Sequence, residues 1–317
     1  MRLASDVVGA LAGRQAGVVT TAQLRDRGAD DVWIGRQVRS GRWRRLHRGV
    51  LLTCSGPISW RARAWAALLY AGPGAALSHE AAAKRHEFIS TPPRVVDVTI
   101  PADRRVMPSP GVTVHLRTDG PRASGRPRTT WRGDTVVDLV DSALTTDDAV
   151  GWVCRASRAG TNRAEILDAV EHRGRFRNSG LLREIVAEVA EGIESPLERR
   201  YHRDVERRHR LPRARLQVSE VVRGLWIRAD AVYDPYGVRA ELDGNLGHPG
   251  GRTDQDTWRD NAVMLATGDL TLRYRWRHVA VDPCVTAAQV ATALTRGGWR
   301  GAPHPCSPTC VVRVGHG

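Results

Sequence analysis

The chain has 317 residues, of which 41% are hydrophobic and 26% are charged, as in globular proteins. This composition excludes a disordered, a collagenous and a membrane-spanning chain, and the length predicts two or three domains. Forty-eight basic residues against 34 acidic residues give a formal net charge of +14. Such a charge favours a polyanionic partner, nucleic acid before an anionic membrane surface.

The positive charge is concentrated in the first quarter of the chain. Residues 1–70 contain twelve arginines and four aspartates, an excess of eight positive charges, as a nucleic-acid-binding surface needs. Lys84 is the only lysine. This preference for arginine is typical of a GC-rich bacterial genome, so a single arginine carries little weight.

Cysteine usage and the amino terminus bear on the cellular compartment. The five cysteines are an odd number and widely spaced, which does not predict a disulfide framework: Cys54, Cys154, Cys284, Cys306 and Cys310. Asp6 and Arg14 bracket only a short apolar stretch, so no signal peptide is predicted, and no apolar run approaches the roughly 20 residues of a spanning helix. We expect a cytoplasmic protein.

Residues 5–53 have the pattern of three short helices followed by a hairpin. Each helix has a candidate N-cap, in chain order Ser5, Thr20 or Thr21, and Asp30 or Asp31. In the third helix Ile34 and Val38 face inward, while Arg36 and Arg39 point elsewhere. Residues 43–52 predict two short strands that turn near 47–49. Three helices and a hairpin make a winged helix-turn-helix.

The rest of the chain mixes helix and strand signals. Helical spacing predicts helices at residues 65–70, 78–85, 135–144, 149–156, 164–170 and 181–190, and alternation of apolar residues predicts strands at 96–100 and 112–116. Ser195, Pro196 and Glu198 form a helix-start signature, and that helix runs to about His209. The expected elements after it are strands at 216–222, 227–233 and 238–242, a helix at 256–267, a strand at 270–276 and a helix at 287–295.

The basic helix and hairpin are the first candidate site. Six arginines fall within thirteen residues, with no acidic residue between them: Arg36, Arg39, Arg42, Arg44, Arg45 and Arg48. In a winged helix the second helix of the motif enters the major groove, while wing arginines contact phosphates or the minor groove. An arginine-rich solvated face around a protein-interaction module is the alternative.

Acidic residues of the last domain are the second candidate site. Glu241 and Asp243 lie two apart on a strand and project from the same side, and Asp230 on a neighbouring strand completes a set of three carboxylates. Oxygen ligands of this kind suit Mg²⁺, which activates water and neutralises charge on a scissile phosphate. The alternative is a row of edge-strand acids paired with Arg228, Arg239 and Arg259.

The sequence contains segments that resemble two known families. Ser195-Pro-Leu-Glu198, Ile227-Arg-Ala-Asp230, Ala240-Glu-Leu-Asp-Gly244, His248, Trp258-Arg-Asp260 and Leu272-Arg-Tyr-Arg-Trp276 resemble the domain related to very-short-patch-repair endonucleases. That domain belongs to the PD-(D/E)xK superfamily and is widespread in actinobacterial proteins. Gly17-Val-Val-Thr-Thr-Ala-Gln-Leu24, Ser40-Gly-Arg-Trp43 and His47-Arg-Gly-Val50 resemble the winged helix of AbiEi-type antitoxins of type IV toxin-antitoxin systems.

The nuclease resemblance implies roles for particular residues. Asp230 and Glu241 bind the metal, Asp243 is a further acid, Glu198 supports them from the helix, and His248 positions water or acts as an acid. Asp243 stands where the superfamily carries its lysine, so the usual partner of the attacking hydroxide is missing. Nuclease relatives of this domain also use acidic or histidine-based arrangements, which are compatible with activity.

The expected fold class is α/β, with an α+β arrangement overall. We expect a winged helix-turn-helix at 1–55, a mixed α/β middle domain at 56–190, a restriction-endonuclease-like domain at 191–300 and a Cys/Pro-rich tail at 301–317. His304, Cys306, Cys310 and His316 of the tail are loosely spaced zinc donors, and Cys284 is an uncertain partner. We therefore expect a flexible or packed tail rather than a Zn²⁺ site.

Three functional hypotheses follow. In the first, the head places the protein on DNA and the last domain is a Mg²⁺-dependent endonuclease. In the second, the nuclease fold has no chemistry and the protein is an antitoxin-like transcriptional regulator, which needs only the head and a homodimer. In the third, the protein neutralises a cognate toxin and the basic head is incidental. None of the three involves a membrane.

Overall fold

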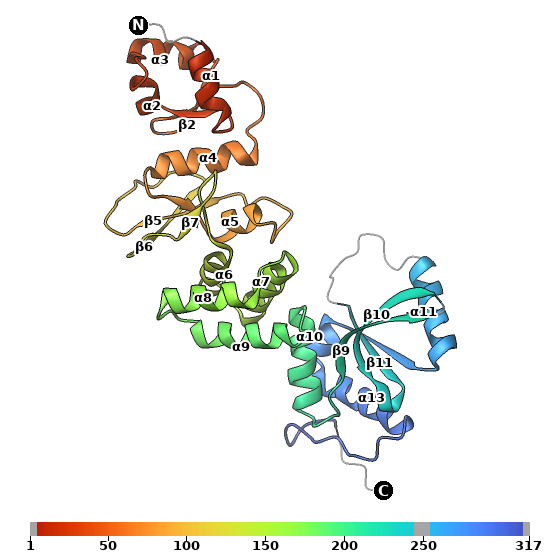
Figure 1. The fold of residues 1–317 in the computed structure, drawn as a ribbon. Coiled ribbons are helices and arrows are strands. Elements are labelled where there is room, and N and C mark those ends of the chain that lie inside the picture. Colours follow the sequence, from red (N-terminus) through yellow and green to blue (C-terminus); the bar gives the residue numbers. More distant parts are fainter. Residues whose placement is uncertain (1–4, 223, 244–253, 313–317) are drawn as a thin grey trace. The chain divides into compact units, whose positions relative to one another are not determined.

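The protein is described by a computed structural model that covers residues 5–222, 224–243 and 254–312 (Figure 1). The chain divides into two compact units. Unit 1 consists of Met1–Thr145 and Arg155–Arg183, and unit 2 of Thr146–Cys154 and Glu184–Gly317. The helices α7 (Thr146–Arg158) and α9 (Ser179–Ala190) contribute residues to both. This division is coarser than the four expected segments, whose boundaries stay predictions.

Unit 1 begins with the expected winged helix. Its helices are α1 (Ser5–Gly13), α2 (Thr21–Arg25) and α3 (Asp31–Arg39). Its strands form an antiparallel sheet in the order β1-β3-β2: β1 (Val18–Thr20), β3 (Val50–Leu52) and β2 (Arg44–His47). Thr20 caps α2 in a reciprocal capping box with Gln23. The core beneath the helices contains Leu24, Ile34 and Trp43.

A second layer of unit 1 is built on α4 (Trp60–Ala71). Its small alanines let two sheets approach one helix. Ala62 and Ala66 pack with Val18 and Leu52 of the winged helix, while Ala64, Ala67 and Leu68 pack against the following sheet. Because α4 is buried on both sides, the apolar residues occupy more than one stripe.

The second sheet has five strands in the order β6-β5-β4-β8-β7. They are β4 (Ala76–Leu77), β5 (Val96–Pro101), β6 (Val112–Arg117), β7 (Ala123–Ser124) and β8 (Thr129–Thr130). The helices of this part are α5 (His79–Arg85), α6 (Arg132–Asp141) and α8 (Arg163–Arg173). At Gly133 an added Cβ would lie 2.0 Å from the carbonyl oxygen of Glu165, so the approach of α6 to α8 requires glycine.

Buried carboxylates tie α6 to the sheet. Asp134 is 2% exposed and binds Arg122 and Arg117 at 2.8 and 3.4 Å, and Asp138 is 3% exposed and binds Arg117 at 2.7 Å and also Arg173. Each buried charge therefore has a partner, as the cost of desolvation requires.

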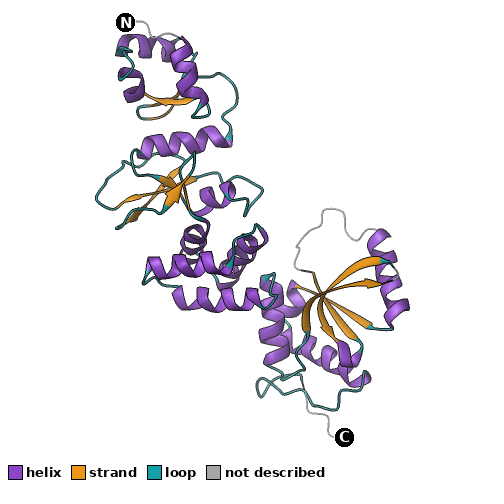
Figure 2. Cartoon of the chain, viewed as in Figure 1, coloured by secondary structure: helices purple, strands orange, loops and turns teal. Residues whose placement is uncertain are grey.

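Unit 2 is built on a sheet whose strands are drawn in orange in Figure 2. The sheet has four strands in the order β12-β11-β10-β9. The strands are β9 (Arg215–Val222), β10 (Leu225–Tyr233), β11 (Val238–Asp243) and β12 (Leu270–Arg275). The first three are antiparallel neighbours, whereas β11 and β12 are parallel. A parallel pair needs a crossover, and α11 (Asp254–Thr267) lies in that connection.

The remaining helices of unit 2 surround a core that includes Tyr201, Val205, Tyr233 and Leu294. They are α10 (Pro196–Arg200), which continues as a π-helix at Tyr201–Arg207, α12 (Trp276–Ala280) and α13 (Pro283–Arg296). Val312 belongs to this core, so the tail packs on unit 2, one of the two arrangements expected for it. Across both units the sequence predicted most of the helices and strands. It did not predict α12 in unit 2 or the two-residue strands β4, β7 and β8 in unit 1.

The mixed α and β architecture and the amino-terminal winged helix confirm the expected fold class. No helix in the described ranges is long and apolar enough to cross a bilayer.

Candidate nucleic-acid interface and carboxylate cluster

Helix α3 presents a basic face because its cap and one buried residue fix its orientation. Asp30 is the N-cap, and its side chain accepts a hydrogen bond from the N–H of Trp33 at 2.7 Å. Ile34 is buried in the core, whereas Arg36 and Arg39 are exposed. The helix thus carries the charge pattern expected of a recognition helix.

The hairpin of β2 and β3 and the turn that leads into it from α3 carry the remaining arginines. Arg42, Arg45 and Arg48 are exposed. Arg44 differs, because it is half-buried and its guanidinium donates to the carbonyl of Gly56. Five of the six predicted DNA-binding arginines are therefore exposed, and the sixth is engaged with the loop after the wing.

The wing is held in place by contacts with the next layer of unit 1. His47 Nδ1 lies 2.8 Å from Ser109 Oγ, and the His47 ring lies 5.1 Å from that of Tyr70. Trp43 is buried and packs edge-to-face on Trp33, with the ring centroids 5.3 Å apart, so it is a core residue rather than a base-stacking one.

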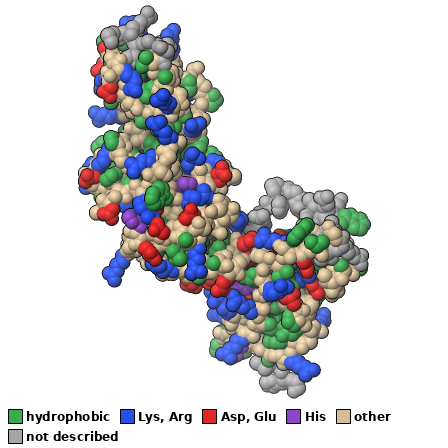
Figure 3. Space-filling model, viewed as in Figure 1, with side chains coloured by type: hydrophobic (Ala, Val, Ile, Leu, Met, Phe, Trp, Pro, Cys, Tyr) green, Lys and Arg blue, Asp and Glu red, His purple; other side chains and the backbone are tan. Residues whose placement is uncertain are grey.

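Basic side chains are spread over the visible face of unit 1, including the part built by the winged helix (Figure 3). Helix α3 and the hairpin can therefore contribute the five exposed guanidinium groups to phosphate binding. Phosphate contacts position a protein on DNA without specifying its sequence. The arrangement provides non-specific affinity, and base contacts along α3 would provide specificity.

The second predicted site lies in unit 2, where Glu198 is buried at the start of α10. Its carboxylate accepts from the N–H of Glu194 at 2.8 Å and from Ser195 Oγ at 2.8 Å. Ser195 Oγ in turn accepts from the N–H of Glu198 at 3.2 Å. These bonds explain the helix-start signature. Burial raises the pKa of the Glu198 carboxyl.

Asp230 on β10 is joined to Glu198 by a residue that the sequence analysis missed. Gln217 Nε2 donates to Asp230 Oδ1 at 3.4 Å and the Gln217 side chain also bonds to Glu198. Gln217 has a left-handed φ of 47°, and it and Asp230 are left out of the strand pairing although the β9–β10 register continues unchanged on both sides. Asp230 Oδ2 accepts from the N–H of Leu242 at 2.7 Å, and burial raises the pKa of Asp230. The sequence signal that could have identified Gln217 is its position between the apolar strand residues Leu216 and Val218.

The other predicted catalytic residues are arranged less tightly. Glu241 is half-buried and lies opposite Arg273 in the β11–β12 register, while Asp243 is exposed. His248 lies outside the described residues. The carboxylates of Asp230, Glu241 and Asp243, all within the described part of the chain, do not come together within the 4.8 Å that a shared metal ion would require.

Two of the arginines proposed as salt-bridge partners bind other acids. Arg228 pairs with Glu194, and Arg239 pairs with Glu220 and with Asp269. The side chain of Arg259, the third proposed partner, is not among the side chains that the structure describes. Buried Glu198 and half-buried Asp230 have oxygen donors that suit a hard cation, so these residues fit Mg²⁺ chemically, although the described carboxylates do not form a closed ligand set.

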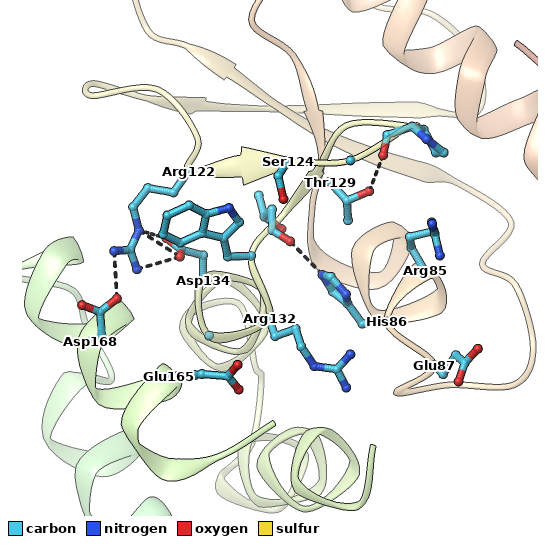
Figure 4. A pocket seen from close by; sticks show the side chains of 15 residues that line it. Arg85, His86, Glu87, Arg122, Ser124, Thr129, Arg132, Asp134, Glu165 and Asp168 are labelled. Atoms are coloured by element: carbon cyan, nitrogen blue, oxygen red, sulfur yellow. Dashed lines mark hydrogen bonds and ion pairs between the residues drawn. The ribbon is translucent and has the colours of Figure 1, made fainter. Parts of the chain in front are cut away.

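A polar cavity of about 580 Å³ lies in unit 1, between α5, α6, α8 and the β7–β8 hairpin (Figure 4). Arg122 crosses it to bind Asp168 and Asp134, both at 2.8 Å, and stacks over Trp131. His86 Nε2 lies 2.7 Å from the carbonyl oxygen of Thr130, and burial lowers the pKa of His86. These contacts compensate polar groups inside the cavity and brace the hairpin against the helices.

Comparisons with known proteins support the winged helix but not the endonuclease-like domain. Residues 8–52 match the family described as "Transcriptional regulator, AbiEi antitoxin". No curated protein matches the chain. A structure described as the RV2827C protein from Mycobacterium tuberculosis is similar at 18% identity and a TM-score of 0.40, over 58% of this chain and 76% of that one. The family match confirms the predicted amino-terminal resemblance, whereas the endonuclease-like resemblance of residues 194–280 stays a prediction.

Proposed function

We propose that this protein is a DNA-binding transcriptional regulator of the AbiEi antitoxin type. In this proposal α3 enters the major groove and the wing contacts flanking phosphates. The observation that carries it is the coincidence of the family match at residues 8–52 with the five exposed arginines of that segment.

The finer parts of the proposal concern partners. A type IV toxin-antitoxin role implies a cognate toxin protein, whose gene would be adjacent. DNA recognition by a homodimer would add a second half-site and so sharpen specificity. Both are expectations of the antitoxin assignment, and size-exclusion chromatography with light scattering tests the dimer.

The central test is DNA affinity after removal of charge from α3 and the wing. A duplex is selected by the full-length protein from a random-sequence library, and its affinity is measured by fluorescence anisotropy. Arg36→Gln, Arg39→Gln and Arg42→Gln combined should weaken binding on the order of 100-fold, because three charge-assisted contacts of about 1 kcal/mol each are lost.

The matched control removes the same charge elsewhere in unit 1. Arg94, Arg126 and Arg163 are also exposed, and their combined change to Gln should leave the affinity within about threefold. Equal losses in the two triple variants would reject the assigned surface. Failure of the library to yield any preferred duplex would reject the regulator.

A Mg²⁺-dependent endonuclease is the second candidate function. It is favoured by the chain of contacts from Glu198 through Gln217 to Asp230, which holds a buried and a half-buried carboxylate together. If Mg²⁺ binds, Asp230 and Glu241 would hold it and it would supply activation of the attacking water. Glu198 and Gln217 would orient Asp230.

Cleavage of plasmid and linear DNA with Mg²⁺ or Mn²⁺ tests this candidate. Asp230→Asn and Glu241→Gln should each abolish nicking while retaining DNA binding. Asp234→Asn is the control, since Asp234 lies just beyond β10 and pairs with Arg215. DNA binding without metal-dependent cleavage of any substrate would leave the regulator and remove the nuclease.

A further inference from the structure

Three cysteines and one histidine from distant parts of the chain converge in unit 2. His209 follows the π-helix, Cys284 lies in the first turn of α13, and Cys306 and Cys310 belong to the tail. Their four potential ligand atoms all lie within 4.8 Å of one another. His209 is fully buried and the three cysteines are half-buried.

The distances between these atoms suit a shared ion better than a covalent bond. Cys284 Sγ lies 3.4 Å from Cys306 Sγ, and Cys310 Sγ lies 3.6 Å from His209 Nε2. Two sulfur ligands of a tetrahedral zinc ion lie about 3.8 Å apart, because each Zn–S bond is about 2.3 Å long. A disulfide would require about 2.05 Å.

The surroundings orient the donors toward a common centre. His209 Nδ1 lies 3.0 Å from the carbonyl oxygen of Val205, so Nδ1 carries the proton and the lone pair of Nε2 faces the cysteines. The carbonyl of His209 accepts from the N–H of His304 at 2.8 Å, which fixes the tail beside the histidine. The N–H of Cys310 bonds to the carbonyl of Ser307 at 3.1 Å and closes the turn between the two tail cysteines.

We propose that His209, Cys284, Cys306 and Cys310 bind a structural zinc ion. Three thiolates and one imidazole are a known structural zinc set, and soft sulfur donors exclude Mg²⁺ and Ca²⁺. All four tetrahedral positions are taken by side chains, so no position remains for a reacting water. The ion fastens the tail and the start of α13 to the end of the π-helix.

This proposal reverses the expectation from the sequence, which considered His304 and His316 as the nitrogen ligands. His304 is exposed and contributes its backbone N–H instead, and His316 lies outside the described residues. The histidine that completes the set stands 75 residues before Cys284, a separation that no short metal-binding motif has.

Metal content of the full-length protein tests the proposal. Protein purified under reducing conditions is analysed for zinc, iron, copper and nickel by mass spectrometry, and about one zinc per chain is expected. Cys310→Ser and His209→Ala should each lose most of that zinc. Cys54→Ser is the control, because Cys54 is an exposed thiol in unit 1 and should leave the zinc content unchanged.

A second measurement on the wild-type chain avoids any dependence on variant folding. Under native conditions an alkylating reagent should modify Cys54 quickly and leave the three site cysteines protected, and a chelator should expose them while releasing zinc in equal amount to protein. Wild-type protein without metal, zinc retained in full by Cys310→Ser, or a Cys284–Cys306 disulfide found by peptide mapping would each overturn the proposal.

Discussion

The folded protein changes the protonation of a histidine in unit 1, His79, relative to that in water. His79 begins α5 with a left-handed φ of 46°, its Nδ1 lies 3.0 Å from Ser78 Oγ, and its ring stacks on His115 with the centroids 3.7 Å apart. Burial, with His115 and Arg117 nearby, lowers the pKa of His79 to about 3. The folded protein therefore keeps this imidazole neutral.

This shift makes folding stability depend on pH in a defined window. Above pH 6.5 neither state protonates His79, but between pH 6.5 and about 3 only the unfolded chain binds the proton. Stability should therefore fall with decreasing pH by up to about 1.4 kcal/mol per pH unit from this residue. His79→Asn keeps a residue that tolerates the left-handed backbone and removes the titration.

Hydrogen exchange measured on peptides of α5 between pH 7 and pH 4 should show a steeper loss of protection for the wild type than for His79→Asn, after correction for the intrinsic exchange rate. Peptides of α3, which lie away from His79, serve as the internal reference in both proteins. Parallel pH profiles would show that His79 is already protonated in the folded state.

At the scale of elements, short segments depend on their caps. Helix α3 has nine residues, too few to be stable alone, and its carboxylate cap at Asp30 satisfies one of the N–H groups of the first turn. The core contact of Ile34 then fixes which side of the helix is exposed. The basic face of α3 thus depends on one cap and one buried side chain.

Removal of this cap should loosen the proposed DNA-binding surface. Asp30→Ala is expected to cost about 1 kcal/mol of local stability, measured by hydrogen exchange on peptides of α3. Asp26→Ala removes the same charge from an exposed residue just after α2 and should change α3 by much less. Equal exchange in the two variants would mean that α3 is held by packing alone.

At the scale of the whole molecule, a formal charge of +14 predicts electrostatic binding to any DNA. If the five exposed arginines of the winged helix contact phosphates, the logarithm of the affinity should fall with the logarithm of salt concentration with a slope of about −4.5 per chain. The Arg36, Arg39 and Arg42 triple variant should reduce this slope to about −2. A slope unchanged by these substitutions would place the phosphate contacts on other surfaces.

Local sequence patterns were sufficient for the winged helix, because its elements are adjacent in the chain. Asp30 before Ile34 and the turn at Arg48-Gly49 are short-range signals, and the helices and hairpin appear where these signals place them. In unit 2 the signature of Ser195 and Glu198 also fixed the start of a helix. The continuation of that helix as a π-helix was not visible in the sequence, because packing decides it.

Contacts between distant residues were decided only by the tertiary structure. Gln217 reaches Asp230 because the antiparallel register of β9 and β10 places the two residues opposite each other, and His209 meets Cys284, Cys306 and Cys310 because the tail folds back on the π-helix. Arg44, which looks like its neighbours in the sequence, binds the carbonyl of Gly56. The sequence by itself determined the class of the elements and the sign of the charge, since both depend on neighbouring residues. Which side chains meet depends on the packing of segments far apart in the chain.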